Sequence, residues 1–310
     1  MSYTSYLLID HIQIQGANAL SSPLTYGFPA INGFLGAIHA LDRHLSQQHK
    51  SEDQKILLGG VGIVSHQCNI QRYRSKSGAD YSFNQTRNPL KKDGKVAAII
   101  EEGKAQLTLS LVVEVIADRN THRALKKDST DIQNRVNQQL LKQRVAGGSI
   151  TQIKSVKWFD SVDTDELTRA LLPGFVLMDA RAELISITQE LQQQQPEATA
   201  LDGLIEAATL HHLPPDPKSG KKDWQTKTVK TGLGWLVPMP VGYQGLAEEY
   251  APHQLAHCRS PQYPSQYVEA IYSLGKWVFP YSIQDLTHIF WRYAKSQDDL
   301  YLITQTQHNI

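Results

Sequence analysis

Residues 107–116 read LTLSLVVEVI, a run of alternating and β-branched residues that predicts a β-strand. Toward the N-terminus, residues 56–64 predict another strand, which runs on toward Ile70. Residues 29–45 carry apolar side chains at helical spacing behind a proline, which predicts a helix. Near-alternation of apolar and polar side chains over residues 6–14 predicts the first strand of the chain.

Downstream of residue 116, a helix and a further strand are expected. Thr130 is predicted to open the helix, with Gln133 placed for a capping box, and the helix is expected to stop at Gly147-Gly148. Residues 149–159 predict the last strand of this group. The predicted order is strand, helix, strand, strand, helix, strand, so the expected fold class is α+β with a ferredoxin-like (RRM-like) core.

Two regions are expected along the chain. Residues 1–160 are predicted to form the core, with a basic hairpin inserted at about residues 71–96. Residues 161–310 are predicted to form a helical and extended C-terminal region. In that region, residues 235–243 (WLVPMPVGY) predict an edge strand or an extended packing segment. The Pro- and Lys-rich residues 213–231 predict a mobile loop or linker.

Helices are also expected in the C-terminal region. The predicted segments are residues 164–172, 181–195, 202–211 and 283–293. In the N-terminal helix, the small residues Gly33 and Gly36 are expected to let the helix approach a sheet closely, at some cost in helix propensity.

Composition indicates a globular protein. The 310 residues are 41% hydrophobic and 20% charged, enough to bury a substantial core. No apolar run approaches the roughly 18 residues that a membrane span needs, and the N-terminus lacks the features of a signal peptide. Cys68 and Cys258 are far apart, and neither has a second thiol nearby. We therefore expect a cytoplasmic protein with no cofactor, no metal site and no membrane partner.

The formal net charge of +1 hides a strong segregation of charge along the chain. Residues 72–95 carry seven cations and two anions, and residues 119–157 carry nine cations and two anions. Residues 158–212 instead carry two cations and ten anions. This pattern predicts a basic face suited to a polyanion, and an acidic stretch that suits a protein partner or is merely solvated.

The first basic segment also contains aromatic residues. Tyr73, Tyr81 and Phe83 are interleaved with its arginines and lysines. Cations can contact phosphates and aromatic faces can stack on bases, so the segment suits a single-stranded nucleic acid. A solvated surface hairpin is the alternative interpretation.

The glycine turn at residues 147–149 has two interpretations. Its backbone N–H groups, with Arg144 and the Ser149 hydroxyl, could form a phosphate cradle within a strongly basic segment. A helix C-cap explains the glycines equally well.

No catalytic constellation is evident. Gly60-Val61-Gly62 precedes a β-branched strand rather than a helix, which argues against a dinucleotide-binding turn. His11, His39 and His66 lie on predicted regular elements, where packing is the expected role. We expect the protein not to be an enzyme.

Five blocks of sequence resemble one protein family. They occur in order along most of the chain: ANALSSPLTYGFPAINGFLGAIHAL (17–41), FNQTRNPLKKDGKVAAIIEEGKAQL (83–107), RVAGGSI (144–150), LTRALLPGF (167–175) and GWLVPMPVGY (234–243). Together they resemble the family of second Csy proteins. That family belongs to the Cas-five group and supplies a subunit of the type I-F CRISPR–Cas surveillance (Csy, or Cascade-type) complex.

The resemblance implies a fold, a role and partners. It implies an RRM-like core of the RAMP superfamily with a thumb-type hairpin and added helices, and a non-catalytic role in antiviral defence. The implied partners are the 5′ handle of the CRISPR RNA, the large subunit and the first backbone subunit, with any contact to target DNA indirect. The acidic residues 160–206 are a candidate surface for the large subunit, by charge complementarity alone.

The resemblance also implies RNA-binding residues in three segments. In the loop after the first strand, four polar side chains are expected to bond phosphates or base edges and Tyr26 to stack: Asn18, Ser21, Ser22 and Thr25. In the hairpin, Phe83 is expected to stack, Asn84 and Asn88 to read bases, and three arginines to supply charge: Arg72, Arg74 and Arg87. In the glycine turn, the expected residues are Arg144, Gly147, Gly148 and Ser149.

Two other functions compete with this interpretation. A metal-independent CRISPR RNA-processing endoribonuclease of the same superfamily would use a histidine such as His66 or His11 as general acid or base. A protein-interaction adaptor would have an incidental basic surface, and its RNA affinity would be weak and sequence-blind.

Overall fold

The chain divides into two compact units. The computed structural model describes residues 2–48, 56–215, 223–258, 260–294 and 299–305. The first unit comprises Met1–Phe175 and Gln284–Trp291, and the second comprises Val176–Ile283 and Arg292–Ile310. The first unit therefore extends past residue 160, where we expected the core to end. Among the described residues, no helix is both long and apolar enough to cross a membrane.

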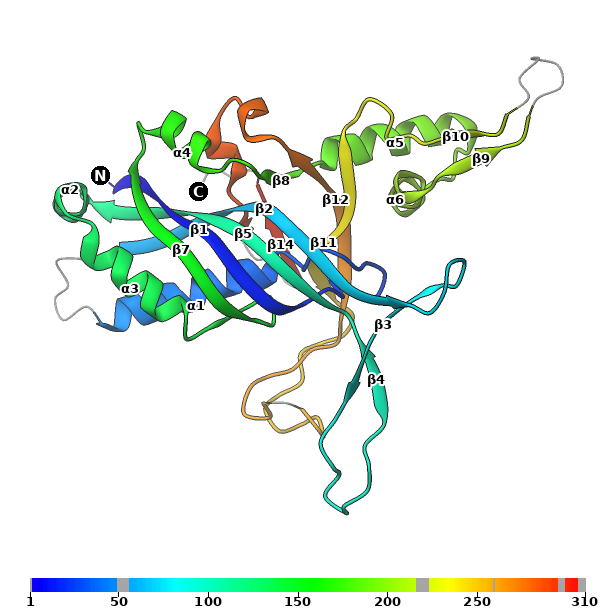
Figure 1. Cartoon of the computed structure of the whole chain (residues 1–310), viewed down its shortest axis with the longest axis horizontal. Coiled ribbons are helices and arrows are strands. Elements are labelled where there is room, and N and C mark those ends of the chain that lie inside the picture. The colour runs from blue at the N-terminus through cyan, green and yellow to red at the C-terminus, as the bar shows by residue number, and fades with distance from the viewer. Residues whose placement is uncertain (1, 49–55, 216–222, 259, 295–298, 306–310) are drawn as a thin grey trace. The chain divides into compact units, whose positions relative to one another are not determined.

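An antiparallel sheet forms the centre of the first unit (Figure 1). Its main strands are β1 (Ser2–Asn18), β2 (Ile56–Arg74), β5 (Lys104–Asp118) and β7 (Gly148–Asp160). They lie in the order β2-β5-β1-β7, and each is antiparallel to its neighbours. The short strand β6 (Arg144–Val145) pairs with β7. All four main strands were predicted, although β1 and β2 are longer than their sequence patterns indicated.

Helices α1 (Asn32–Gln48) and α3 (Thr130–Leu140) pack against each other and against this sheet. The apolar stripe predicted for α1 is buried throughout: Ile31, Phe34, Leu35, Ile38, Leu41 and Leu45. Burying each such side chain contributes about 1.5–3 kcal/mol relative to leaving it exposed. The apolar periodicity of the sequence thus predicted the buried face of α1 correctly. Two shorter helices, α2 (Arg119–Lys127) and α4 (Thr164–Ala170), complete the helices of this unit among its described residues.

Helix α3 begins at Thr130, as predicted, but the predicted capping box and the predicted end of the helix are wrong. The N-cap of α3 is Ser129, and the Gln133 amide donates to the Ser129 hydroxyl at 2.8 Å instead of forming a box with Thr130. The helix then ends at Leu140, well before the glycines, which instead form the turn between β6 and β7. The glycines end no helix because Arg144 and Val145 are extended and pair with β7.

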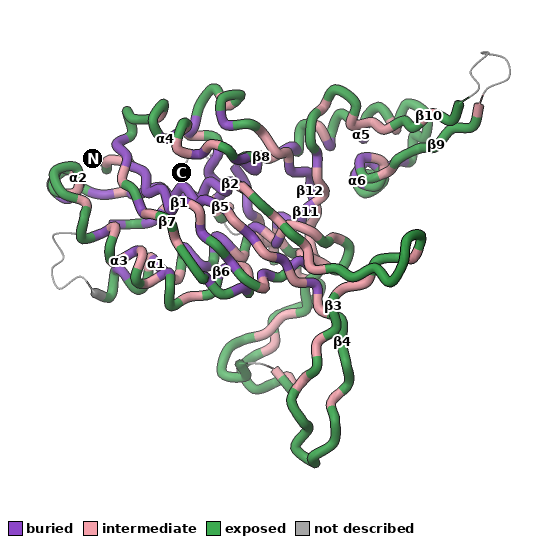
Figure 2. The backbone as a smooth tube through the Cα atoms, in the orientation of Figure 1, coloured by how far each residue is buried: buried purple, intermediate pink, exposed green. Residues whose placement is uncertain are grey.

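The inserted hairpin is present as an arm of the first unit. Strand β3 (Tyr81–Arg87) pairs with the end of β2 and with β4 (Ile99–Glu102). Figure 1 shows the arm leaving the sheet where β2 ends, and Figure 2 shows that most of its residues are exposed. The arm therefore adds surface without adding to the core.

The second unit contains five further antiparallel strands. Its strands are β8 (Phe175–Asp179), β11 (Trp235–Gly245), β12 (Val268–Val278), β13 (Arg292–Tyr293) and β14 (Leu300–Thr304), in the order β13-β14-β11-β12-β8. Helices α5 (Arg181–Gln194) and α6 (Ala200–Ala208) supply apolar side chains to a core that includes Leu236 and Leu274 of the sheet.

Strand β11 matches the edge-strand prediction over part of its length. It pairs with β12 along its length and with β14 only over Gly242–Gln244. Pro238 and Pro240 lie in the part of β11 that, within the described residues, pairs only with β12. Proline suits this position because it has no N–H group to donate to a second strand.

Two other C-terminal predictions had mixed outcomes. The helix expected over residues 283–293 is wrong: a short 3-10 turn, η3 (Leu286–Ile289), and strand β13 form there. The apolar residues of η3 are buried. Part of the loop expected over residues 213–231 instead forms a small sheet, in which β9 (His211–Leu213) pairs with β10 (Gln225–Lys227). Its residues 216–222 lie outside the described residues. A further 3-10 turn, η2 (Pro280–Ser282), follows β12.

Candidate nucleic-acid interface

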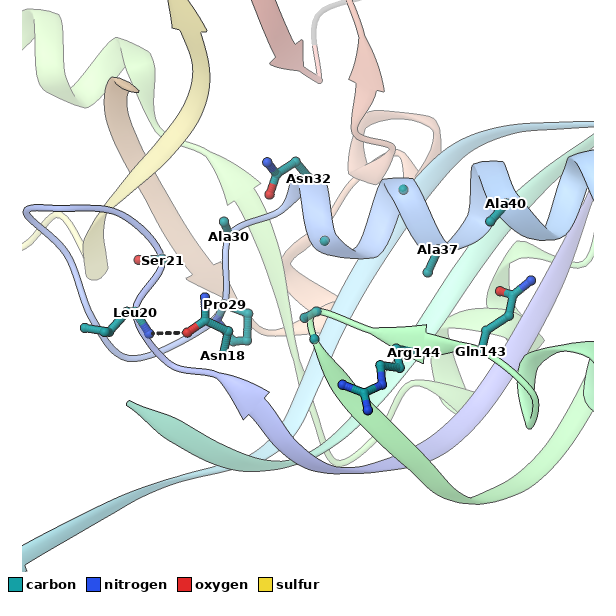
Figure 3. A pocket seen from close by; sticks show the side chains of 14 residues that line it. Asn18, Leu20, Ser21, Pro29, Ala30, Asn32, Ala37, Ala40, Gln143 and Arg144 are labelled. Carbon is teal, nitrogen blue, oxygen red and sulfur yellow. Dashed lines mark hydrogen bonds between the residues drawn. The ribbon is translucent and has the colours of Figure 1, made fainter. Parts of the chain in front are cut away.

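An open groove in the first unit collects predicted site residues from three separate segments (Figure 3). It lies between the start of α1, the loop after β1 and the β6–β7 turn, and its volume is about 610 Å³. Asn18, Ser21, Arg144 and Gly147 all line it. The fold therefore brings the glycine turn and Arg144 together with Asn18 and Ser21, which the sequence could associate with them only through the family resemblance.

The β6–β7 turn is held close to both β1 and α1. Ala146 (φ 48°) and Gly147 (φ 80°) are both left-handed, as in the tight turns that suit two-residue hairpins. The Ala146 carbonyl accepts a hydrogen bond from the Asn18 N–H at 2.8 Å. A Cβ on Gly33 would lie 2.9 Å from the Ala146 Cα, so glycine at this position lets α1 approach the turn. The expectation of a close approach is confirmed for Gly33.

Gly148 serves packing, and the structure does not place it among the residues that line the groove. A Cβ on this buried residue would lie 2.5 Å from Ile14 Cγ2 and 2.8 Å from the Ala17 nitrogen. Ser149 is exposed on β7 and pairs with Arg144 of β6, but it does not line the groove either. Of the four residues predicted to form the phosphate cradle, only Arg144 and Gly147 line the groove.

Hydroxyl groups shape the loop after β1. The Thr25 hydroxyl lies 2.7 Å from both the Ser21 and the Ser22 hydroxyls, and the Thr25 N–H donates to the Ser22 hydroxyl at 3.0 Å. Such local bonds stabilise turns. Of these three residues, only Ser21 lines the groove. RNA contacts by Ser22 and Thr25 remain predictions.

Aromatic side chains connect this loop to the arm. Tyr26 is 61% exposed, and its ring meets the Phe83 ring edge-on, with centroids 5.6 Å apart. The Arg72 and Arg74 guanidinium carbons lie 4.2 Å and 5.0 Å from the centroid of Tyr81. These cation–π contacts restrict the two arginines and occupy Tyr81. Tyr73, which was not among the predicted site residues, is 60% exposed.

The polar residues of β3 do not share one face. Successive side chains of a strand point to opposite sides, so Arg87 shares the side of Phe83, and Asn84 points to the other side. Asn88 follows the end of the strand. A single RNA strand that stacks on Phe83 would therefore reach Arg87 from the same side, but not Asn84.

The second basic segment is partly neutralised by ion pairs. Three of its nine cations face carboxylates: Lys126 with Asp160 at 2.5 Å, Lys154 with Asp10 at 3.0 Å and Arg135 with Asp131 at 3.6 Å. The hydrogen bond from Lys126 holds the pKa of Asp160 below its usual range. Within the described residues, the Arg144 side chain forms no hydrogen bond or ion pair and is exposed, so its charge remains available to a ligand.

The groove also contains polar residues that the sequence did not single out. Asn32 begins α1, and Gln143 lies in the turn after α3. Asn32 lies in the first of the five blocks, where no role was predicted for it, and Gln143 precedes the third block. The packing of α1 beside the β6–β7 turn brings both to the groove.

A second polar cluster lies at a bulge of β1. The register of β1 shifts between Ile9 and Ile12, and His11 has a φ of 47°. The His11 Nδ1 lies 2.5 Å from Asp10 Oδ1, and its ring stacks on His66 with centroids 3.9 Å apart. Burial alone would raise the pKa of Asp10, but hydrogen bonds from His11 and Lys154 outweigh this effect and hold the pKa below its usual range.

The hydrogen bonds of His66 define its tautomer. Its Nδ1 lies 2.6 Å from the Pro173 carbonyl, which can only accept, so Nδ1 carries the proton. Its Nε2 then accepts from the fully buried Ser110 hydroxyl at 2.7 Å. Burial is the main reason that the pKa of His66 is lowered. Both ring nitrogens therefore form hydrogen bonds within the protein, as expected for a structural histidine.

The same cluster fits a metal ion poorly. Ligand atoms of Asp10, His11 and His66 lie within 4.8 Å of one another. However, the two rings are nearly parallel, at 14°, so their nitrogen lone pairs do not converge on one point.

One protein family and one known protein match this chain along most of its length. Residues 7–303 match the family described as CRISPR-associated protein (Cas_Csy2). The chain is also 36% identical, over 314 residues, to a Pseudomonas aeruginosa (strain UCBPP-PA14) protein named CRISPR-associated protein Csy2. That alignment covers 94% of this chain and 92% of the Pseudomonas protein.

Proposed function

Because this chain belongs to the Csy2 family of CRISPR-associated proteins, we propose that it is a non-catalytic subunit of the type I-F CRISPR RNA-guided surveillance complex. In this role it binds the 5′ handle of the CRISPR RNA and pairs with the large subunit and the first backbone subunit. The complex acts in antiviral defence.

The proposed core is RRM-like, within the RAMP superfamily. The strand order β2-β5-β1-β7, with α1 after β1 and α3 before β7, supports this assignment because it combines a strand–helix–strand–strand–helix–strand sequence with an antiparallel sheet. The exposed arm of β3 and β4 corresponds to the proposed thumb-type hairpin.

The groove is the observation that carries the RNA-binding proposal. It places the unpaired guanidinium of Arg144 beside Asn18 and Ser21. A guanidinium can bind a phosphate through two parallel hydrogen bonds, and amide and hydroxyl side chains can bond phosphate, sugar or base. Such a set suits an RNA backbone better than it suits an apolar ligand.

The junction of the loop and the arm supplies a second proposed RNA surface. Tyr26 and Phe83 offer aromatic faces there, and Arg87 lies on the same side of β3 as Phe83. Stacking on aromatic rings beside cations is the usual way to bind single-stranded RNA.

The endoribonuclease remains the second candidate, because the structure places its two candidate histidines in ring contact. Against it, the imidazole nitrogens of His66 are both hydrogen-bonded, and its Ser110 partner is fully buried. A general acid or base must instead reach the substrate.

Handle binding by Arg144→Gln tests the proposal. The chain would be purified with its large subunit and incubated without metal with an RNA carrying the 5′ handle of its CRISPR locus. We expect the variant to lose at least about tenfold in affinity. The slope of log affinity against log salt should also fall by about 0.7, the value for one phosphate contact in single-stranded RNA. Lys142 is exposed and lies outside the groove, so Lys142→Gln is the matched control and should change the affinity and its salt dependence little.

Three results would contradict the proposal. Equal losses for Arg144→Gln and Lys142→Gln would mean that the groove does not bind the handle. Unchanged affinity after the handle bases are scrambled would favour the adaptor. RNA cut at a defined site, with cutting lost in His66→Ala or His11→Ala, would identify the chain as a processing nuclease.

A further inference from the structure

One end of the groove contains a buried amide without a partner. The side-chain Nε2 and Oε1 atoms of Gln143 are buried, and within the described residues neither forms a hydrogen bond. Figure 3 shows the Gln143 side chain directed toward α1, near Ala40. Buried polar groups in folded proteins are nearly always hydrogen-bonded, so an unpaired amide beside a groove indicates that a ligand in the groove supplies its hydrogen-bond partner.

The helix wall beside Gln143 is small and apolar. Gly33, Gly36, Ala37 and Ala40 recur at helical spacing and line the groove along one side of α1. A Cβ added to Gly36 would meet no atom within 4 Å, so the space beside the helix is open there. A low apolar wall of this kind can contact the flat face of a planar group.

The other lining residues restrict the chemistry of the ligand. No aspartate or glutamate lines the groove, and Arg144 is its one charged lining residue among those described. A volume of about 610 Å³ falls within the range of about 300–1,000 Å³ typical of small-molecule sites. The single cation suits a ligand with one anionic group, and the apolar wall and the Gln143 amide suit a neutral, planar, polar group. A nucleotide has both groups.

We propose that this end of the groove binds one nucleobase of the RNA, with its face against Ala37 and Ala40 and its edge on the Gln143 amide. The inference rests on the proposed RNA-binding function and adds a base-reading residue to it. A glutamine amide presents a donor beside an acceptor, which is complementary to the N6 amino group and N7 of adenine. Adenine is therefore the expected base. Arg144, next in the chain, binds the phosphate of the same nucleotide.

Rotation of the glutamine side chain makes this contact accessible. In the free protein the amide faces the helix and has no described partner. Rotation between staggered rotamers would turn it toward a bound base. The free protein is then less stable than it would be with an apolar residue at position 143, whereas the RNA-bound protein gains two hydrogen bonds.

An abasic scan of the RNA handle tests the inference. Each handle nucleotide would be replaced in turn by an abasic ribose, and affinity measured for the wild-type chain and for Gln143→Ala, each with its large subunit. The wild type should lose about 5- to 150-fold at one position, the range for a good bidentate base contact. Gln143→Ala should bind the intact handle more weakly by a similar factor and show no further loss at that position. Gln138→Ala, an exposed glutamine of α3, is the matched control and should keep the wild-type profile.

Stability of the free chain gives a second measurement. Gln143→Leu should raise its midpoint of thermal unfolding by about 2–4 °C while weakening handle binding. A lower midpoint would show that Gln143 has a structural partner and would overturn the inference.

The outcomes separate this inference from the function on which it rests. If the wild type does not bind the handle at all, the proposed function fails. If it binds, but Gln143→Ala leaves the abasic profile unchanged or weakens every RNA equally, only the base-reading role fails. At the position identified, replacement of the base by each of the other three should also weaken binding; equal affinity for another base would overturn the adenine assignment.

Discussion

Gly33 and Gly36 of α1 are predicted to respond in opposite directions to the same substitution. In a helix interior, Gly→Ala gains about 0.8–1 kcal/mol from helix propensity. A Cβ on Gly36 would meet nothing within 4 Å, whereas one on Gly33 would lie 2.9 Å from the Ala146 Cα and 3.2 Å from its Cβ. The Ala146 backbone is held in place because its carbonyl accepts the hydrogen bond from the Asn18 N–H.

The size of each effect follows from these contacts. Overpacking against fixed backbone costs about 1–3 kcal/mol, and Gly33 is the second residue of α1, where the propensity gain is reduced. We expect Gly33→Ala to lower the free energy of unfolding by about 1–2 kcal/mol and Gly36→Ala to raise it by about 1 kcal/mol. Since 1 kcal/mol shifts the midpoint by about 2–4 °C in a unit of this size, the two variants should differ by about 4–12 °C.

Thermal and urea unfolding of the purified variants, followed by circular dichroism, would measure this difference. Gly36→Ala is the control for Gly33→Ala, because both make the same change in the same helix. Gly36→Ala also adds a methyl group to the groove, so it should weaken handle binding while it stabilises the chain. Midpoints that shift equally and in the same direction would refute the steric argument.

Three further predictions concern other parts of the first unit. Gly148→Ala should lower the free energy of unfolding by about 1–3 kcal/mol or more, because its Cβ would meet the backbone of Ala17; an unchanged urea midpoint would refute this. Burial lowers the pKa of His66, so the unfolded chain binds the proton more readily, and stability should fall as the pH drops through about 6.5 toward the folded value. His66→Gln should flatten that pH dependence between pH values of about 7 and 5, as measured by unfolding at each pH. Arg87→Ala should cost about 1–3 kcal/mol in handle affinity if Arg87 contacts a base, and an unchanged dissociation constant would remove Arg87 from the interface.

The family could be identified from the sequence, and the match over residues 7–303 confirms it. Five blocks in the expected order carried enough information for this, although no single block did. The placement in the Cas-five group and the individual RNA contacts stay predictions. A family resemblance indicates which segments carry the function, but it does not fix the direction of each side chain.

The glycine turn shows where sequence interpretation failed. Gly147 and Gly148 follow a helical pattern, and glycine serves equally well in a helix C-cap and in a tight hairpin turn. The structure decides for the hairpin because Arg144 and Val145 pair with the start of β7. This difference matters for function, because it makes Gly148 a packing residue.

By itself, the sequence determined the buried stripe of α1, the four main strands of the first unit and the basic, aromatic arm. These features depend on short-range periodicity and turn chemistry, which neighbouring residues encode. Only the tertiary structure decided that Asn18, Arg144 and Gln143 share a groove, that Lys154 neutralises Asp10 and that His11 stacks on His66. Those contacts join residues far apart in the chain, and they depend on strand register and on the close approach that Gly33 allows, which residue spacing along the chain does not specify.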